Sequence, residues 1–155
     1  MRVVLQRVHR AEVQVDGQPV GACGRGVLLL VGIGPQDLEK DAQWMARKIA
    51  GLRIFPDSEG RMNLSLLDIQ GSALSISQFT LYGDCRKGRR PSFLGAAKPD
   101  LAEALWEKFC ELLLAEGVPT ARGRFGADMQ ISANADGPVT LVLESPCSSK
   151  PSKQP

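Results

Sequence analysis

The chain has 155 residues, of which 43% are apolar, and its 19 basic and 17 acidic side chains give a formal net charge of +2. This length allows one domain with a hydrophobic core, and the small net charge means that any RNA-binding site must come from local clustering of basic residues. The apolar N-terminal run is interrupted by Gln6, Arg7 and His9, and no apolar stretch is long enough to cross a bilayer. We therefore expect a soluble intracellular protein.

The N-terminal third predicts a set of strands. Residues 2–8 and 11–15 are rich in β-branched side chains, and Asp16-Gly17 is typical of a hairpin turn. Residues 27–33, VLLLVGI, are apolar on both faces of an extended chain, which indicates a central strand that is fully buried.

A helix is expected next, with Asp37 as its N-cap and Gly51 near its end. Its apolar residues recur at helical spacing and would form one buried stripe: Ala42, Met45, Ala46 and Ile49. Residues 53–67 have the composition of a loop, with a turn over residues 57–60.

Residues 73–82, ALSISQFTLY, predict another strand, and a long loop rich in polar residues and glycine follows over residues 83–98. A second helix is expected after Pro99, with Asp100 as its cap, and it would end at Gly117. Its buried stripe would contain Leu101, Leu105, Phe109, Leu112 and Leu113.

Short strands are expected at residues 128–133 and 139–144, and the Pro/Ser/Lys-rich end, residues 145–155, is expected to be disordered. Hairpins combined with two separated helices predict the α+β class. We expect a single domain, residues 1–144, with two main helices and a mostly antiparallel, barrel-like sheet.

The sequence offers few side chains for conventional catalysis. His9 is the only histidine, and a lone histidine at a strand end is typical of the surface, so a Ser-His-Asp or Cys-His arrangement is not expected. The cysteines are widely spaced and include no CxxC pair: Cys23, Cys85, Cys110 and Cys147. We expect reduced thiols, no metal site and no cofactor.

Two segments depart from an ordinary scaffold. Residues 77–81, SQFTL, place three polar side chains in a strand that is otherwise apolar, and burying such groups without partners costs about 1–3 kcal/mol each. Residues 136–140, DGPVT, combine a turn signal with the start of a strand. Taken separately, the first segment is compatible with a polar sheet edge and the second with a simple turn.

Together the two segments resemble the signature motifs of the D-aminoacyl-tRNA deacylase family. The family motif Ser-Gln-Phe-Thr-Leu matches residues 77–81 completely. The second motif, an Asn-x-Gly-Pro sequence followed by a short residue and Thr, matches at Gly137, Pro138 and Thr140, whereas Ala135 occupies the asparagine position. Further blocks in the family's order extend the likeness over residues 1–144: 6–8, 52–55, 62–66, 88–93 and 125–129.

The resemblance implies a cytoplasmic homodimer with its active sites at the subunit interface and no cofactor. Its pocket would be lined largely by main-chain atoms and would receive the 3′-terminal adenosine of aminoacyl-tRNA. The implied reaction is hydrolysis of the ester of D-aminoacyl-tRNA, and of mischarged glycyl-tRNA, with help from the ribose 2′-OH, while L-aminoacyl-tRNA is rejected.

Site residues follow from the matched motifs. Those expected at the catalytic centre are Ser77, Gln78, Phe79 and Thr80. Those expected to contact substrate are Phe125, Met129, Arg89 and Arg90. Gly137 and Pro138, joined by a cis peptide bond, would point their carbonyls into the partner's pocket and exclude L side chains. An aminoacyl ester is already activated, so orientation and backbone N–H donors near Phe79 and Thr80 would suffice, and Thr80 is expected to act in positioning rather than as a nucleophile.

Ala135 differs from the family's asparagine at a position that would help to hold the second motif in place. Alanine cannot make the local hydrogen bonds that asparagine makes in turns. Asp136, or Asn134 shifted by one position, would have to take over this role.

Two other functions stay open at this point. The basic residues of the long loop, Arg86, Lys87, Arg89 and Arg90, form either a solvated charged loop or a set of phosphate contacts. With such contacts the protein could be a non-catalytic module that binds the tRNA end. The third hypothesis is a related esterase that acts on small esters.

Overall fold

The computed structural model describes residues 1–146. The strands are β1 (Arg2–Val15), β2 (Gln18–Cys23), β3 (Gly26–Gly32), β4 (Phe55–Pro56), β5 (Met62–Leu64), β6 (Ser72–Ser77), β7 (Thr120–Arg122) and β8 (Gln130–Glu144). The helices are α1 (Glu39–Gly51), the 3-10 helix η1 (Phe79–Tyr82) and α2 (Pro99–Ala115). Most of the expected disordered tail lies outside the described residues, but Ser145 is fully buried, so the prediction was wrong at that position.

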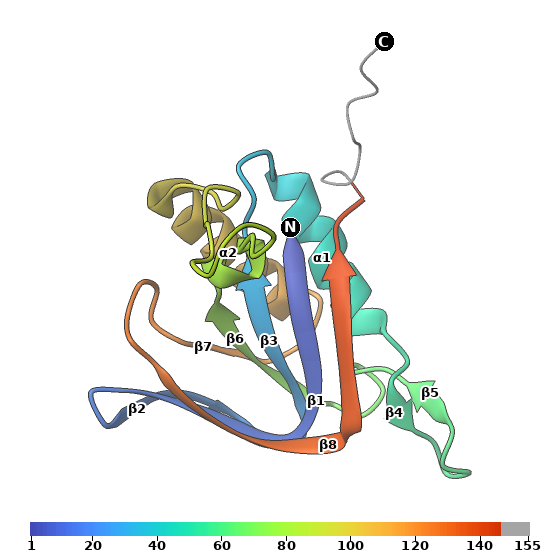
Figure 1. Cartoon of the computed structure of the whole chain (residues 1–155). Helices are drawn as coiled ribbons and strands as arrows, with labels where there is room; N and C mark the ends of the chain where they lie inside the picture. The colour runs from blue at the N-terminus through green and yellow to red at the C-terminus, as the bar shows by residue number, and fades with distance from the viewer. Residues whose placement is uncertain (147–155) are drawn as a thin grey trace.

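A mixed sheet of six strands has the order β2-β1-β3-β6-β7, with β8 paired to β1. β1 is antiparallel to β2, β3 and β8, whereas the β3–β6 and β6–β7 pairs are parallel. Figure 1 shows the long strands β1 and β8 bending together, so that the sheet curls into a nearly closed, barrel-like shape. This arrangement confirms the expected α+β class and the single domain.

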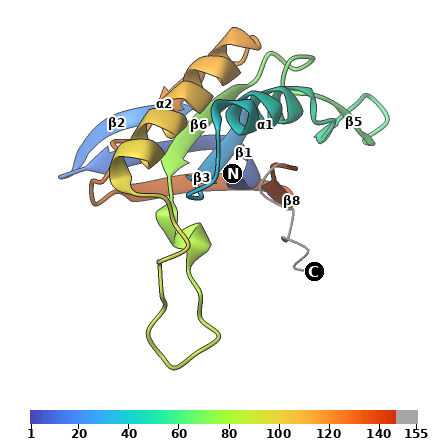
Figure 2. The same cartoon turned by 90° about the horizontal axis from the view of Figure 1, so that it is seen from above.

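Both main helices pack on the same side of the sheet and lie next to each other (Figure 2). The predicted stripe of α1 is buried at every position, and β3 is buried along nearly its whole length, as expected. In α2 the side chains of Leu105, Phe109 and Leu113 are buried, but Leu101 is 40% exposed. None of the helices described in residues 1–146 is long and apolar enough to cross a membrane.

Both predicted helix caps were wrong. Helix α1 has Leu38 as its N-cap, and the Asp41 carboxylate accepts a hydrogen bond from the Leu38 N–H at 3.0 Å. Asp37 instead pairs with the α-ammonium group of Met1 and accepts a hydrogen bond from the Gly34 N–H at 2.6 Å. The N-cap of α2 is Lys98.

Several strand boundaries also differ from expectation. The strand predicted at 73–82 ends at Ser77 and gives way to η1, whereas the two final strands are one continuous β8. Residues 2–8 and 11–15 likewise form a single strand, and the loop predicted at 53–67 contains the small β4–β5 hairpin. The Asp16-Gly17 turn is confirmed, with φ values of 51° and 74°, typical of a tight hairpin turn.

Candidate active site

A cavity of about 580 Å³ opens between the sheet, α2 and the segment that leads into β8. The ends of β3 and β6 and the residues just after them contribute Val31, Ile33, Ile76, Ser77, Gln78 and Phe79. The remaining wall is formed by Phe93, Ala96, Ala97, Pro99, Ala102, Trp106, Phe125, Gly126, Ala127, Met129 and Ile131. None of these lining residues is an acid, a base or a cysteine, so the cavity itself has no side chain suited to general acid–base chemistry.

The first motif reaches the cavity at the point where β6 ends and η1 begins. Ser77, Gln78 and Phe79 line the cavity, whereas Thr80 follows on the exposed side of η1. The Gln78 side-chain amide donates a hydrogen bond to the Thr80 hydroxyl oxygen. An amide donor cannot remove a proton, so the Thr80 hydroxyl has no base beside it.

The backbone of the same segment presents two free N–H groups. The Gln78 N–H donates to the Val31 carbonyl at 2.7 Å, and the Leu81 N–H donates to the Gln78 carbonyl at 3.3 Å. The intervening amides of Phe79 and Thr80 have no hydrogen-bond acceptor among the described residues. Two adjacent unpaired amides, the first of which belongs to the cavity-lining Phe79, are suited to stabilise a developing negative charge on oxygen.

The back of the cavity is an aromatic wall fixed by a buried hydrogen bond. The indole Nε1 of Trp106 donates to the Ser75 hydroxyl oxygen at 2.9 Å, and both residues are almost fully buried. The rings of Trp106 and Phe125 have centroids 6.0 Å apart. Next to this wall, burial raises the pKa of Cys110 to about 11, so its thiol packs as a neutral group.

Two of the predicted substrate contacts, Phe125 and Met129, are part of this wall. Trp106 was missed by sequence reasoning, although it stands four residues after Ala102 on one face of α2. That helical spacing is the signal that could have placed Trp106 at the cavity.

The second motif lies elsewhere, on a bulge of β8. Thr140 pairs with Gln6 and Ala135 pairs with Val8, so the residues from 136 to 139 face a single residue of β1. The Gly137–Pro138 peptide bond is cis, as predicted, and Gly137 has a φ of 120°. Both residues are exposed, and neither lines the cavity of the same chain.

The bulge is held by a buried arginine that sequence reasoning did not single out. Arg7 Nε lies 2.9 Å from Asp136 Oδ2, and the Arg7 side chain is only 9% exposed. The Arg7 guanidinium also donates to the Ile54 carbonyl at 2.6 Å. His9 is 59% exposed and lies 3.7 Å from Asp136. Asp136 is therefore the residue that anchors the segment next to Ala135.

The long loop after η1 projects away from the sheet (Figure 2). Its base is closed by two backbone hydrogen bonds between Asp84 and Ser92. The Arg86 guanidinium is held by the Asp84 carboxylate at 2.9 and 2.6 Å, and this contact keeps the pKa of Asp84 well below its usual range. Arg89 and Arg90 are exposed, form no ion pair with a described residue and do not line the cavity.

Known proteins resemble this chain along nearly its whole length. Residues 4–144 match the family described as D-Tyr-tRNA(Tyr) deacylase. A D-aminoacyl-tRNA deacylase of Desulfatibacillum aliphaticivorans is 54% identical, and one of Bacillus cereus (strain B4264) is 59% identical. Both alignments cover 94% of this chain and 99% of the relative.

Two solved structures have the same fold. One, described as the c-Myc DNA unwinding element binding protein, is 41% identical with a TM-score of 0.87 and covers 94% of this chain and 99% of its own. The other, a probable eukaryotic D-amino acid tRNA deacylase, is 21% identical with a TM-score of 0.80 and covers 92% of this chain and 98% of its own. From the family match and the bacterial relatives, this chain belongs to the D-Tyr-tRNA(Tyr) deacylase family.

Proposed function

We propose that this chain hydrolyses the ester bond between a D-amino acid and tRNA and thereby prevents D-amino acids from being used in translation. The observation that carries the proposal is the family match over residues 4–144, together with Ser77, Gln78 and Phe79 of the first motif at the wall of a large cavity. Because aminoacyl-tRNA is made and used in the cytoplasm, we also propose that the protein acts there.

The proposed chemistry needs little from side chains. Water attacks the ester carbonyl carbon, the bond from this carbon to the ribose oxygen breaks, and a proton passes to that oxygen. The free amides of Phe79 and Thr80 would stabilise the negative charge on the carbonyl oxygen. The ribose 2′-OH next to the ester would orient or activate the water. A substrate with a 2′-deoxy terminal adenosine should therefore react more slowly.

The cavity is suited to the 3′-terminal adenosine of tRNA. Its lining is apolar and aromatic, with Trp106, Phe125 and Met129 able to contact a flat base, while the motif residues lie at its other wall. Ser77 and Gln78 would bind polar atoms of the ribose or ester. Thr80 would act by positioning, since its hydroxyl is paired with Gln78.

Chiral selection is assigned to Gly137 and Pro138 of a second copy of the chain. Neither residue reaches the cavity of its own chain, and residues 130–135 of β8 are all exposed, which is unusual for a strand in a sheet that encloses a core. A symmetric homodimer would cover this surface and create two equivalent sites. Carbonyls of the partner's bulge would then occupy the space of an L side chain, and rejection would be steric.

Glycyl-tRNA is the proposed second substrate, because glycine has no side chain for such a filter to exclude. The basic residues Arg89 and Arg90 would contact tRNA phosphates outside the cavity, while Arg86 is already paired with Asp84.

The direct test is the release of D-tyrosine from D-tyrosyl-tRNA by the purified protein, compared with buffer and with added EDTA. We expect release well above buffer and no effect of EDTA. Release at the buffer rate would reject the proposal.

A non-catalytic nucleic-acid-binding module is the second candidate, and it is favoured by the description of one solved relative as a DNA-unwinding-element binding protein. The same assay separates the two candidates, because such a module would bind tRNA without releasing amino acid. A general esterase would be recognised by turnover of small esters and by indifference to chirality.

A further inference from the structure

The 3-10 helix η1 has little to hold it in place by itself. Helices of this kind have poor hydrogen-bond geometry, and none of the four residues of η1 is buried. Its backbone bonds to neighbouring residues are the one from Leu81 to Gln78 at 3.3 Å and the one from Gly83 to Thr80 at 2.9 Å. Because the Phe79 and Thr80 amides belong to this segment, their position must be fixed by contacts from other parts of the chain.

Arg2, at the start of β1, supplies two of these contacts. Its guanidinium Nη1 donates to the Leu81 carbonyl at 2.6 Å, and the guanidinium carbon lies 4.9 Å from the centroid of the Tyr82 ring. One side chain therefore holds two successive residues of η1. The other partner of Arg2 is Glu144, at 2.6 Å, but these side chains are 36% and 47% exposed, and such surface pairs contribute little.

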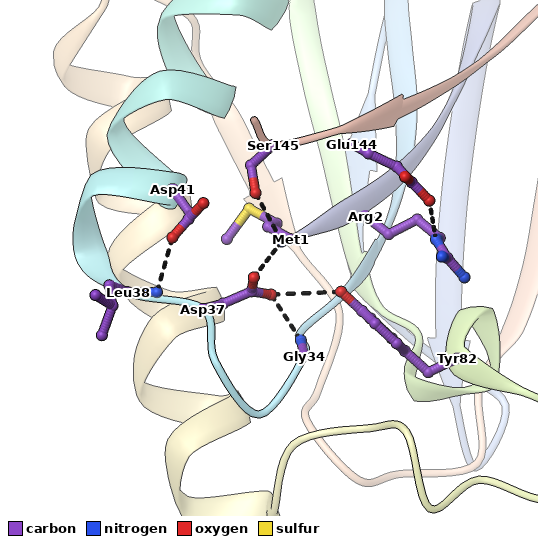
Figure 3. Close-up of polar contacts among 9 residues, drawn as sticks. All are labelled: Met1, Arg2, Gly34, Asp37, Leu38, Asp41, Tyr82, Glu144 and Ser145. Carbon is purple, nitrogen blue, oxygen red and sulfur yellow. Dashed lines mark hydrogen bonds and ion pairs between the residues drawn. The ribbon is translucent and has the colours of Figure 1, made fainter. Parts of the chain in front are cut away.

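Tyr82 connects η1 to a buried charge centre (Figure 3). Its hydroxyl lies 3.4 Å from Asp37 Oδ2, and the Asp37 carboxylate pairs with the α-ammonium group of Met1. The ammonium group also donates to the Ser145 hydroxyl oxygen at 2.8 Å. Burial and the negative charge of Asp37 raise the pKa of Tyr82, so its hydroxyl stays protonated and can donate to that carboxylate.

Two glycines of the neighbouring chain segment let η1 come this close. A Cβ atom on Gly34 would lie 2.9 Å from the Tyr82 hydroxyl oxygen, and one on Gly32 would lie 3.1 Å from the Gln78 carbonyl oxygen and from Leu81 Cβ. Neither glycine has a positive φ. Both positions therefore favour glycine because of the close approach of η1 and not because of backbone conformation.

We propose that Arg2 and Tyr82 are positioning residues for the hydrolysis. They fix η1 on the Met1–Asp37 pair so that the amides of Phe79 and Thr80 stay beside the cavity that Phe79 lines. This inference rests on the proposed function, and it adds residues that contact neither the cavity nor the substrate.

The first experiment compares steady-state kinetics on D-tyrosyl-tRNA for Arg2→Ala, Arg2→Lys and Glu144→Gln. Arg2→Ala should lower kcat by about tenfold, equivalent to about 1.4 kcal/mol, and should change KM by less than about twofold, because the cavity lining is unaltered. Arg2→Lys should recover part of kcat, since its ammonium group can still donate to the Leu81 carbonyl. Glu144→Gln should match the wild type.

A second variant reaches η1 from the opposite side. Gly34→Ala should push the Tyr82 ring away and lower kcat to a similar degree, whereas Gly24→Ala, where a Cβ atom would meet nothing within 4 Å, should have no effect. Urea denaturation of each variant checks that the protein is folded at the assay temperature.

Arg2→Ala and Gly34→Ala variants that keep kcat within about twofold of the wild type would overturn the inference. So would an equal loss in Glu144→Gln, or a loss that falls entirely on KM. A wild-type protein that does not hydrolyse D-tyrosyl-tRNA would overturn the proposed function as well, whereas an active wild type with active variants would overturn only this inference.

Discussion

The two motif regions of this protein differ in how much of their surroundings one chain supplies. Residues 77–79 line a cavity whose wall includes Trp106 and Phe125, and the adjacent amides of Phe79 and Thr80 have no acceptor among the described residues. Gly137 and Pro138 sit on an exposed bulge that is anchored from below by Arg7 but faces no cavity of its own chain. The groups that we propose for hydrolysis therefore lie within one chain, whereas the groups that we propose for substrate selection face outward and would act on a neighbouring copy.

The largest expected effect is a loss of stability when the aromatic wall of the cavity is removed. Trp106→Ala removes a buried indole and leaves the Ser75 hydroxyl without its donor, so the free energy of unfolding should fall by about 3–5 kcal/mol. Urea denaturation measures this loss. Trp44→Ala, at a half-buried tryptophan of α1 outside the cavity, should cost clearly less, and equal losses would show that the wall has no special role.

The bulge should break when its anchor is removed. Asp136→Ala leaves the nearly buried Arg7 guanidinium without its counter-ion, so the free energy of unfolding should fall by about 1–3 kcal/mol, less than for a fully buried pair because Asp136 is 20% exposed. Selectivity for D- over L-tyrosyl-tRNA should fall with it. His9→Ala is the control, since it removes only the exposed neighbour, and a matching loss there would contradict the anchoring role of Arg7.

Gly137→Ala sharpens the comparison because it alters the bulge without changing its charge. A Cβ atom would lie 2.9 Å from Val139 N and 3.1 Å from Arg7 Nη2, at a φ of 120° that residues with side chains rarely adopt. We expect a loss of about 1–3 kcal/mol in unfolding free energy and a drop of about tenfold or more in the ratio of D to L rates. Gly51→Ala, with open space around it, is the matched control. If the ratio of D to L rates is unchanged in Gly137→Ala, the bulge does not take part in chiral selection.

The smallest expected effect concerns the loop that lies outside both regions. The double variant Arg89→Ala, Arg90→Ala should weaken tRNA binding and lower the salt dependence of the binding constant by about 0.7–0.9 in slope for each phosphate that is no longer neutralised. Arg86→Ala should have a smaller effect, because that guanidinium is already paired with Asp84. If the tRNA affinity and its salt dependence are unchanged in the double variant, the loop does not contact tRNA.

Local patterns predicted the parts of the molecule that local physics determines. The stripe of α1, the buried strand β3 and the Asp16-Gly17 turn follow from periodicity and turn chemistry, and they are present as expected. The strand expected at 73–82 was wrong beyond Ser77, because β-branched and aromatic residues favour a strand while contacts from Arg2 hold the chain in a 3-10 helix.

Residues far apart in the chain account for what sequence reasoning missed. Asp37 has the side chain of a good N-cap, but it pairs with the ammonium group of Met1. The sequence pattern around α1 does not predict this distant partner. The Arg7–Asp136 pair likewise forms only when β1 and β8 pair, and the Trp106–Ser75 bond only when α2 packs on β6. Phe125 and Met129 were placed in the site by resemblance to the family, and the cavity lining contains both.

The most direct test of the central claim measures the release of D- and L-tyrosine from the matching tyrosyl-tRNAs by one preparation of purified protein, at a concentration where light scattering shows a dimer. We expect D-tyrosine to be released at least about 100-fold faster than in buffer, since preorganised oxyanion donors alone contribute about that much. L-tyrosine should be released at the buffer rate. Release of both enantiomers at similar rates, or no release of D-tyrosine above buffer, would contradict the assignment of a D-selective deacylase.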